Sequence, residues 1–177
     1  HEVTLTYSFE LGKFEVMQGQ FREKMGFEPS FWGGCDRCPV ERVSWHQAAA
    51  FTNRLSDEAG LTSCYTCMQQ DENFRCQPAI SPLSCDGYRL PTESEWEFAA
   101  RDAGETPSPS VAGGWDATRE ELEACAEGMA LDNGATLDAH AWFCANSDAT
   151  PGRTTRPVGQ LEANGLGLHD MSGNVWE

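Results

Sequence analysis

Eight cysteines in a loop-rich chain of 177 residues restrict the folds open to it more than any other feature. The chain has 17 Gly and 9 Pro spread along its length, which predicts many turns around a modest amount of regular structure. The cysteines stand at Cys35, Cys38, Cys64, Cys67, Cys76, Cys85, Cys125 and Cys144. Their even number favours a disulfide framework, whose pairing stays open because eight cysteines allow 105 pairings.

Zinc is the competing interpretation, because Cys35/Cys38 and Cys64/Cys67 each have the C-x-x-C spacing of a zinc-binding pair. The two pairs could converge on one tetrahedral ion. The segment 64–85 is short and polar, however, so it buries too little apolar surface to offset the entropy of ordering it. We therefore favour disulfides, and with them a secreted, extracellular or periplasmic protein.

Charge excludes two classes of partner. The formal net charge of -16 repels phosphate backbones and anionic lipid, so we expect neither nucleic-acid binding nor membrane association. No apolar run is long enough to insert into a bilayer. With 40% hydrophobic residues, the chain can bury one sizeable core, and we expect a single domain over 1–177.

The first main helix is predicted over about 45–59. Ser44 and Gln47 stand three residues apart ahead of an Ala-rich run, which is the pattern of a capping box. Gly60 is the expected left-handed terminator. We expect Trp45 and Leu55 to lie on the buried face of this helix.

The second main helix is predicted over about 93–103, with Thr92 as its cap and Glu95 as the reciprocal partner. The same spacing recurs at Thr118 and Glu121, which predicts a mostly solvated helix there.

The N-terminal third should be mixed in structure. Alternating apolar and polar residues over 3–9 predict a half-buried strand, and residues 14–16 predict a continuing sheet edge. A short helix is expected from Gln18 to Lys24, stopping at Gly26.

Several ordered motifs extend this pattern along the chain. They are EVMQGQF at 15–21, PVERVSW at 39–45, YRLPTESEWEFAAR at 88–101, RPVG at 156–159, NGLGLHDM at 164–171 and GNVWE at 173–177. In content and order they resemble the formylglycine-generating-enzyme, or sulfatase-modifying-factor, superfamily. The resemblance implies an α+β fold, a loop-rich variant of the C-type lectin fold with two main helices and short twisted strands.

The resemblance also bears on catalysis. Oxidases of this superfamily hold copper with two cysteines downstream of the GNxWE motif, whereas this sequence stops at Glu177. None of the eight cysteines matches those positions, so we expect a domain that lacks the family's C-terminal catalytic region and carries no catalytic residues of its own. The four histidines show no metal-ligand spacing.

Calcium is the cofactor that the resemblance implies. The family's calcium turn maps onto the side chains of Asp170 and Glu177 and the carbonyls of Gly173 and Val175. Carboxylate and carbonyl oxygens are the ligands that this hard cation prefers. The alternative is that Asp170 and Glu177 only cap turns.

A second family calcium site maps onto the Asn146 side chain and the Ser147 carbonyl, with Asp148 as a further candidate. The loop 148–156 departs from the enzyme pattern, so its remaining ligands have no counterpart here. The alternative is that Asn146 makes a hydrogen bond within the loop.

The expected function is a secreted, calcium-stabilised, disulfide-bonded binding or assembly module without catalytic cysteines. One alternative is part of a formylglycine-generating-type metal-dependent oxidase whose C-terminal region is missing. Another is a calcium-dependent carbohydrate or protein binder. Because stopping at Glu177 should leave a strand edge uncovered, we expect a protein partner or self-assembly that completes the C-terminal part of the fold.

Tryptophans could contribute to binding as well as to the core. Trp32 and Trp115 lie in Gly-flanked loops and are candidates for contacts with sugars or proteins. The remaining four are expected to pack in the core, since large aromatic side chains dominate burial. These are Trp45, Trp96, Trp142 and Trp176.

Overall fold

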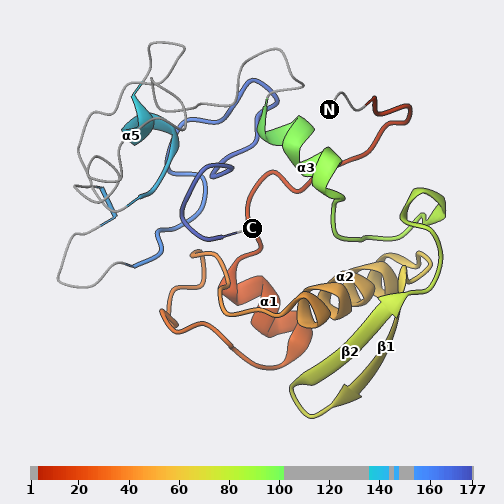
Figure 1. The fold of residues 1–177 in the computed structure, drawn as a ribbon. Coiled ribbons are helices and arrows are strands. Elements are labelled where there is room, and N and C mark those ends of the chain that lie inside the picture. The colour runs from red at the N-terminus through yellow and green to blue at the C-terminus, as the bar shows by residue number, and fades with distance from the viewer. Residues whose placement is uncertain (1–3, 102–135, 144–145, 148–153, 177) are drawn as a thin grey trace, which may run out of the picture. The chain divides into compact units, whose positions relative to one another are not determined.

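The computed structural model describes residues 4–101, 136–143, 146–147 and 154–176 (Figure 1). Its elements in chain order are α1 (Gln18–Met25), α2 (Trp45–Ala59), β1 (Tyr65–Gln70), β2 (Asn73–Pro78), a 3-10 turn (Pro82–Ser84), α3 (Glu93–Ala100) and α5 (Leu137–His140). This mixture confirms the α+β class. None of the helices in the described ranges is long and apolar enough to span a membrane.

The chain divides into two compact units. The helix–hairpin unit comprises Val16–Asp36 and Val40–Pro91, and the loop unit comprises His1–Glu15, Arg37–Pro39 and Thr92–Glu177. The single domain over 1–177 stays a prediction. The helix expected to start at Thr118 lies outside the described residues. So do Trp115, Cys125 and Cys144.

The capping residues and terminal glycines of the sequence predicted both helices of the helix–hairpin unit correctly. Gln47 N–H donates to the Ser44 hydroxyl at 3.2 Å and Ser44 N–H donates to the Gln47 side chain at 2.8 Å, which confirms the capping box of α2. Gly26 and Gly60 end α1 and α2 with φ of 84° and 70°. Both glycines adopt the left-handed conformation that residues with a Cβ avoid.

Aromatic rings fill the core of this unit. Phe21 of α1 stacks on Phe51 of α2 with centroids 5.5 Å apart, and Phe27 packs edge-on against Phe21. Leu55 is partly buried against the same cluster. The expectation for Trp45 is wrong: as the first residue of α2 it remains 47% exposed, and its ring makes only edge contacts, with His46 and Tyr65.

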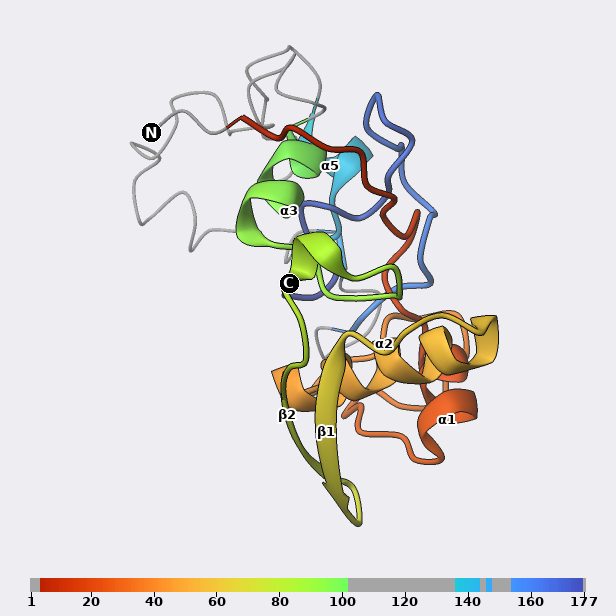
Figure 2. The same cartoon turned by 90° about the vertical axis from the view of Figure 1, so that its right-hand side faces the viewer.

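Strands β1 and β2 form an antiparallel hairpin that sequence analysis did not predict. Figures 1 and 2 show it alongside α2, with its turn projecting beyond the helix. Cys67 and Cys76 face each other across the two strands and are joined by a disulfide. A second disulfide, Cys64 to Cys85, ties the start of the hairpin to the segment that follows it.

Disulfides are therefore confirmed over zinc for this segment. Cys35 and Cys38 are also disulfide-bonded, and no described cysteine is free. The hairpin was missed because its exposed residues are Gln, Asn, Asp and Arg, which signal loops. Its buried face is short: Tyr65, Phe74 and Cys76 join the hydrophobic core, and the disulfides and side chains from α2 add to that packing.

Side chains of α2 bond to backbone groups of both strands of the hairpin. Asn53 donates to the Tyr65 carbonyl at 2.7 Å and accepts from the Tyr65 N–H at 3.1 Å. On the other strand, the His46 Nδ1 accepts from the Cys76 N–H at 3.1 Å. These contacts satisfy backbone groups of Tyr65 and Cys76 that no neighbouring strand pairs with, and covering part of an edge in this way disfavours its pairing with other chains.

Replacing Asn53 by Ala is expected to destabilise the protein by about 1–3 kcal/mol, because both backbone groups of the buried Tyr65 lose their partners. Arg54→Ala is the matched control: it removes an exposed hydrogen bond to Gln69 and should cost less than about 0.5 kcal/mol. Urea unfolding measures both. Equal losses of stability in the two variants would show that the hydrogen bonds of Asn53 to the Tyr65 backbone add no stability of their own.

In the loop unit, α3 begins as predicted and ends early. Thr92 N–H donates to Glu95 Oε2 at 2.7 Å and the Thr92 hydroxyl accepts from Glu95 N–H. The helix ends at Ala100 with Arg101 in a turn, short of the expected end near 103. Residues 102 and 103 lie outside the described ranges.

The strand predicted over 3–9 is wrong for its described part, since residues 4–9 join no ladder. The alternation still sorts the side chains correctly: Leu5, Tyr7 and Phe9 are half-buried. Phe9 packs edge-on against Phe98 of α3 at 6.2 Å. The alternation of apolar and polar residues thus predicted which side chains are buried, although this segment pairs with no strand.

Candidate functional site

Asp170 of the loop unit carries a buried carboxylate. Asp170 is 2% exposed and has a positive φ of 62°. Its Oδ2 accepts a 2.7 Å hydrogen bond from the Gly159 N–H, whereas its buried Oδ1 has no hydrogen-bond partner. A buried carboxylate oxygen is costly without a compensating donor or cation. Asp170 is therefore suited to a cationic ligand.

Gly159, which donates to this carboxylate, packs closely against the ring of Phe14. Gly159 has a φ of 71°, and a Cβ there would lie 2.4 Å from the Phe14 ring. The ring of Phe14 also packs against His169 at 5.1 Å, and the His169 N–H donates to the Lys13 carbonyl. These contacts hold Gly159, which donates to the Asp170 carboxylate, and His169, which precedes Asp170 in the chain.

Gly173 brings the next part of the turn close to Trp142. A Cβ on Gly173 would lie 2.4 Å from the Trp142 carbonyl oxygen, so no side chain fits without movement. That carbonyl accepts from the Asn174 N–H at 2.9 Å. The Gly173 carbonyl accepts from the Val175 N–H at 2.8 Å and retains a second lone pair.

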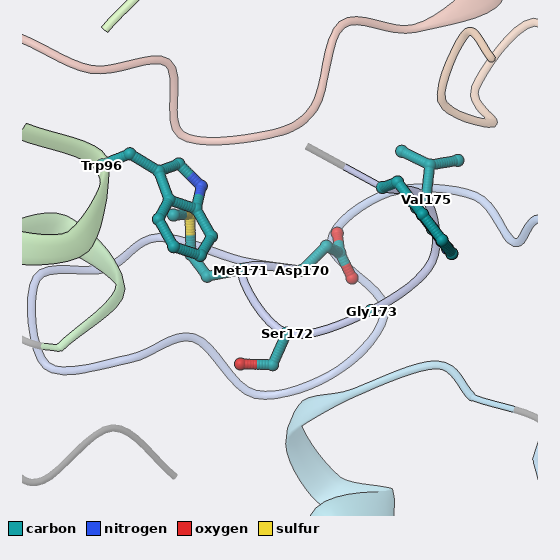
Figure 3. A pocket seen from close by; sticks show the side chains of 7 residues that line it. Trp96, Asp170, Met171, Ser172, Gly173 and Val175 are labelled. Carbon is teal, nitrogen blue, oxygen red and sulfur yellow. The ribbon is translucent and has the colours of Figure 1, made fainter. Parts of the chain in front are cut away.

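The turn from Asp170 to Val175 lines a cavity of about 260 Å³, and we call it the calcium turn after the ion that the sequence predicts there. Figure 3 shows its lining side chains, with Trp96 contributed by α3. The lining residues are Trp96, Asp170, Met171, Ser172, Gly173, Val175 and Trp176. Three of the four predicted ligand positions, Asp170, Gly173 and Val175, therefore lie together.

The fourth predicted ligand, Glu177, lies outside the described residues. In the described part of the chain, no three His, Cys, Asp or Glu side chains converge on one metal position. Any cation at the calcium turn would therefore depend on backbone carbonyls as well as on Asp170. Carbonyl-rich coordination of this kind suits calcium better than softer metals.

The second predicted site has different surroundings. The Asn146 Oδ1 accepts from the Phe143 N–H and its Nδ2 donates to the Ala141 carbonyl, each at 2.9 Å. The Ser147 carbonyl accepts from the Arg156 guanidinium at 2.7 Å. Asn146 thus makes the loop hydrogen bonds of the alternative interpretation, and the Ser147 carbonyl also has a partner. Calcium at Asn146 and Ser147 stays a prediction, and Asp148 lies outside the described residues.

A second feature, in the helix–hairpin unit, is the loop 28–36, which we call the anchored loop. The buried Gln18 donates to the Trp32 carbonyl at 3.0 Å and accepts from the Cys35 N–H at 3.2 Å. Glu41 accepts from the Trp32 N–H at 2.8 Å. The Glu41 N–H donates to the Ser30 hydroxyl.

The far end of the anchored loop is held to α1. Gly19 N–H donates to the Asp36 carbonyl at 3.0 Å, and Arg22 contacts the Asp36 carboxylate at 2.7 Å. The hydrogen bond and the charge of Asp36 raise the pKa of Arg22 above its usual value. Such an exposed pair contributes little to stability but restricts the loop end.

Two aromatic rings point outward from this fixed backbone. Phe31 is 58% exposed and Trp32 is 38% exposed, and their rings meet edge to face at 4.6 Å. The Arg42 guanidinium lies 4.4 Å from the centre of the Phe31 ring, with Arg42 itself at a φ of 60°. Sequence analysis singled out Trp32 but missed Phe31 and Arg42, although the FWGG sequence placed two aromatics before two glycines.

The other tryptophans divide between core and surface. Trp142 is half-buried beneath the Arg156 guanidinium, 5.6 Å from its ring centre, and Trp96 is half-buried on α3. Trp176 is fully exposed, contrary to the expectation of core packing.

The chain is similar in sequence to two named proteins. The chain is 32% identical over 197 residues to the chaperone protein LppX of Paenibacillus barcinonensis, which covers 99% of this chain and 62% of that protein. It is 43% identical over 103 residues to the formylglycine-generating enzyme of Mycobacterium tuberculosis, which covers 56% of this chain and 29% of that enzyme. The chain therefore spans less than two thirds of the length of these relatives.

Solved structures support the fold. Treponema denticola variable protein 1 matches with a TM-score of 0.62 and 30% identity, over 91% of this chain and 58% of that one. CarF matches with a TM-score of 0.54 and 26% identity, over 92% and 64%. The sulfatase-modifying factor enzyme 1-like domain, in turn, matches residues 1–177. Because that match covers the whole chain and the motifs, helices and turn agree with it, the chain belongs to the sulfatase-modifying factor enzyme 1-like (FGE-sulfatase) family.

Proposed function

We propose that this domain is a calcium-stabilised, disulfide-bonded recognition module that acts outside the cytoplasm. The observation that carries recognition is the anchored loop, which exposes Phe31 and Trp32 on a backbone held by Gln18, Gly19 and Glu41. Rigid exposed aromatics contribute little to folding, whereas they supply contact area to a partner at a low entropy cost.

Calcium in this proposal has a structural role. Asp170 and the carbonyls of Gly173 and Val175 would hold it, with Glu177 as a fourth ligand. The unpartnered, buried Oδ1 of Asp170 supports this assignment. The disulfides at Cys64–Cys85 and Cys67–Cys76 support a secreted, extracellular or periplasmic location, since such cross-links persist in oxidising compartments.

The test compares partner capture by three forms of the protein incubated with the extracellular fraction of its own source. Phe31→Ser with Trp32→Ser should lose the captured partner, because the aromatic contact area is removed while the anchoring side chains remain. Trp45→Ser is the matched control, since it removes an exposed tryptophan outside the anchored loop. Capture that is unchanged in the double variant would exclude this loop as the recognition surface.

A glycan array, repeated with a calcium chelator, separates the two classes of partner. We favour a protein partner, including self-assembly, so no glycan should bind. Chelator-sensitive glycan binding would instead assign a calcium-dependent carbohydrate binder.

An oxidase of the formylglycine-generating type is the second candidate, and the 43% identity to the Mycobacterium tuberculosis enzyme favours it. Against it, every cysteine in the described ranges is in a disulfide, so none offers a free thiolate to copper. Conversion of a peptide cysteine to an aldehyde by the copper-loaded natural polypeptide, followed by mass spectrometry, would decide for the enzyme.

A further inference from the structure

Asn174 stands between the two predicted carbonyl ligands of the calcium turn, yet its side chain is occupied elsewhere. Its Nδ2 donates to Glu15 Oε2 at 2.7 Å and to the Arg156 carbonyl at 3.1 Å. Its Oδ1 accepts from the Arg156 N–H at 2.9 Å. The amide thus bonds both backbone groups of Arg156, as a neighbouring peptide would, and also reaches a carboxylate 159 residues away in sequence.

The backbone of Asn174 is held just as firmly. Its N–H donates to the Trp142 carbonyl at 2.9 Å, and its φ of 66° lies in the left-handed region. Asn is among the few residues other than Gly that tolerate this region. Asn174 therefore fixes the turn to three separate segments, those of Glu15, Trp142 and Arg156, all within the loop unit.

We propose that Asn174 is a positioning residue for calcium: without binding the ion, it sets the direction of the Gly173 and Val175 carbonyls. This inference rests on the proposed calcium site. Calcium ligands supplied by backbone carbonyls carry no charge, so their contribution to affinity depends on how well the turn is held before binding. Asn174 is placed to hold it, because its neighbours on both sides are the predicted ligands.

The chemistry of the contacts specifies Asn at this position. Asp would place a second carboxylate against Glu15 and against the Arg156 carbonyl, and would replace two attractive contacts with repulsion. Gly would keep the left-handed backbone accessible and remove only the side-chain contacts. Asn174→Gly therefore separates the anchoring by the side chain from the backbone conformation.

The experiment measures the calcium dissociation constant by isothermal titration, under conditions where circular dichroism shows each variant to be folded. Asn174→Gly should weaken calcium binding by about 10- to 100-fold, the usual effect of removing a group that orients metal ligands. Asn164→Gly is the matched control, because Asn164 also caps a loop, through bonds to Leu166, Leu168 and Ala99. It should lower stability and leave calcium affinity within about twofold.

The outcomes separate the two proposals. No calcium binding by the unaltered protein would overturn the calcium site itself. Binding by the unaltered protein that Asn174→Gly leaves unchanged, or that Asn164→Gly weakens equally, would overturn the positioning role alone. Should Asn174→Gly not fold, Glu15→Gln serves instead: it removes the charge of one Asn174 acceptor and should weaken calcium binding to a smaller extent, and unchanged affinity would contradict the inference.

Discussion

Replacing Cys64 and Cys85 together by Ala is expected to lower the free energy of unfolding by about 3.3 kcal/mol, from the entropy of closing a loop with a sequence separation of 21. Most of the segment between them is polar, and within it only Tyr65, Phe74 and Cys76 are buried in the hydrophobic core. Once the cross-link is gone, the unfolded chain gains freedom that the few apolar contacts of the hairpin do not offset. Urea unfolding at fixed pH measures the loss through the midpoint and slope.

Removing the other hairpin disulfide provides the matched comparison. Cys67 and Cys76 are 9 residues apart, for which the same relation gives about 2.6 kcal/mol. Each pair contains one buried cysteine, Cys64 or Cys76, so the burial costs of the two double Ala variants are similar. A larger loss for the shorter loop would contradict the entropic account and point to strand pairing as the main contribution of Cys67–Cys76.

The sequence predicted those parts of the fold that depend on neighbouring residues. Ser44 with Gln47, and Thr92 with Glu95, specify helix starts within four residues, and Gly26 and Gly60 specify ends at single positions. The hairpin could not be predicted in this way, since Asn53 and His46 supply its edge contacts from another element. Helix caps are local, whereas sheet edges are completed by tertiary structure.

The candidate site shows the same division. Asp170, Gly173 and Val175 could be named from the motif alone, because they lie within one turn. Their supports, Gly159 and Trp142, lie 11 and 31 residues from the groups that they contact, and no period or spacing connects them. What the sequence lacked was the packing that leaves Asp170 Oδ1 buried and unpartnered, which is the feature that motivates a cation there.

Chelation of calcium is expected to destabilise the unaltered protein by about 2.7 kcal/mol relative to a solution with calcium at 100 times its dissociation constant. Asp170→Asn should abolish this difference, because the substitution removes the one charged group among the proposed ligands that lie in the described turn. Asp71→Asn is the matched control: Asp71 also has a positive φ, 55°, but it lies at the tip of the hairpin in the other unit. It should keep the full response to calcium.

The effect of Asp170→Asn on stability should also change sign between the calcium-free and the calcium-bound protein. With chelator present, Asp170→Asn should be at least as stable as the unaltered protein, because it replaces a buried, unpartnered carboxylate oxygen with a neutral amide. With calcium present, the same substitution should be destabilising. Thermal unfolding of both proteins, each with calcium and with chelator, measures all four values. If Asp170→Asn were equally destabilising in both solutions, the carboxylate would serve the Gly159 hydrogen bond alone, and the calcium assignment would fail.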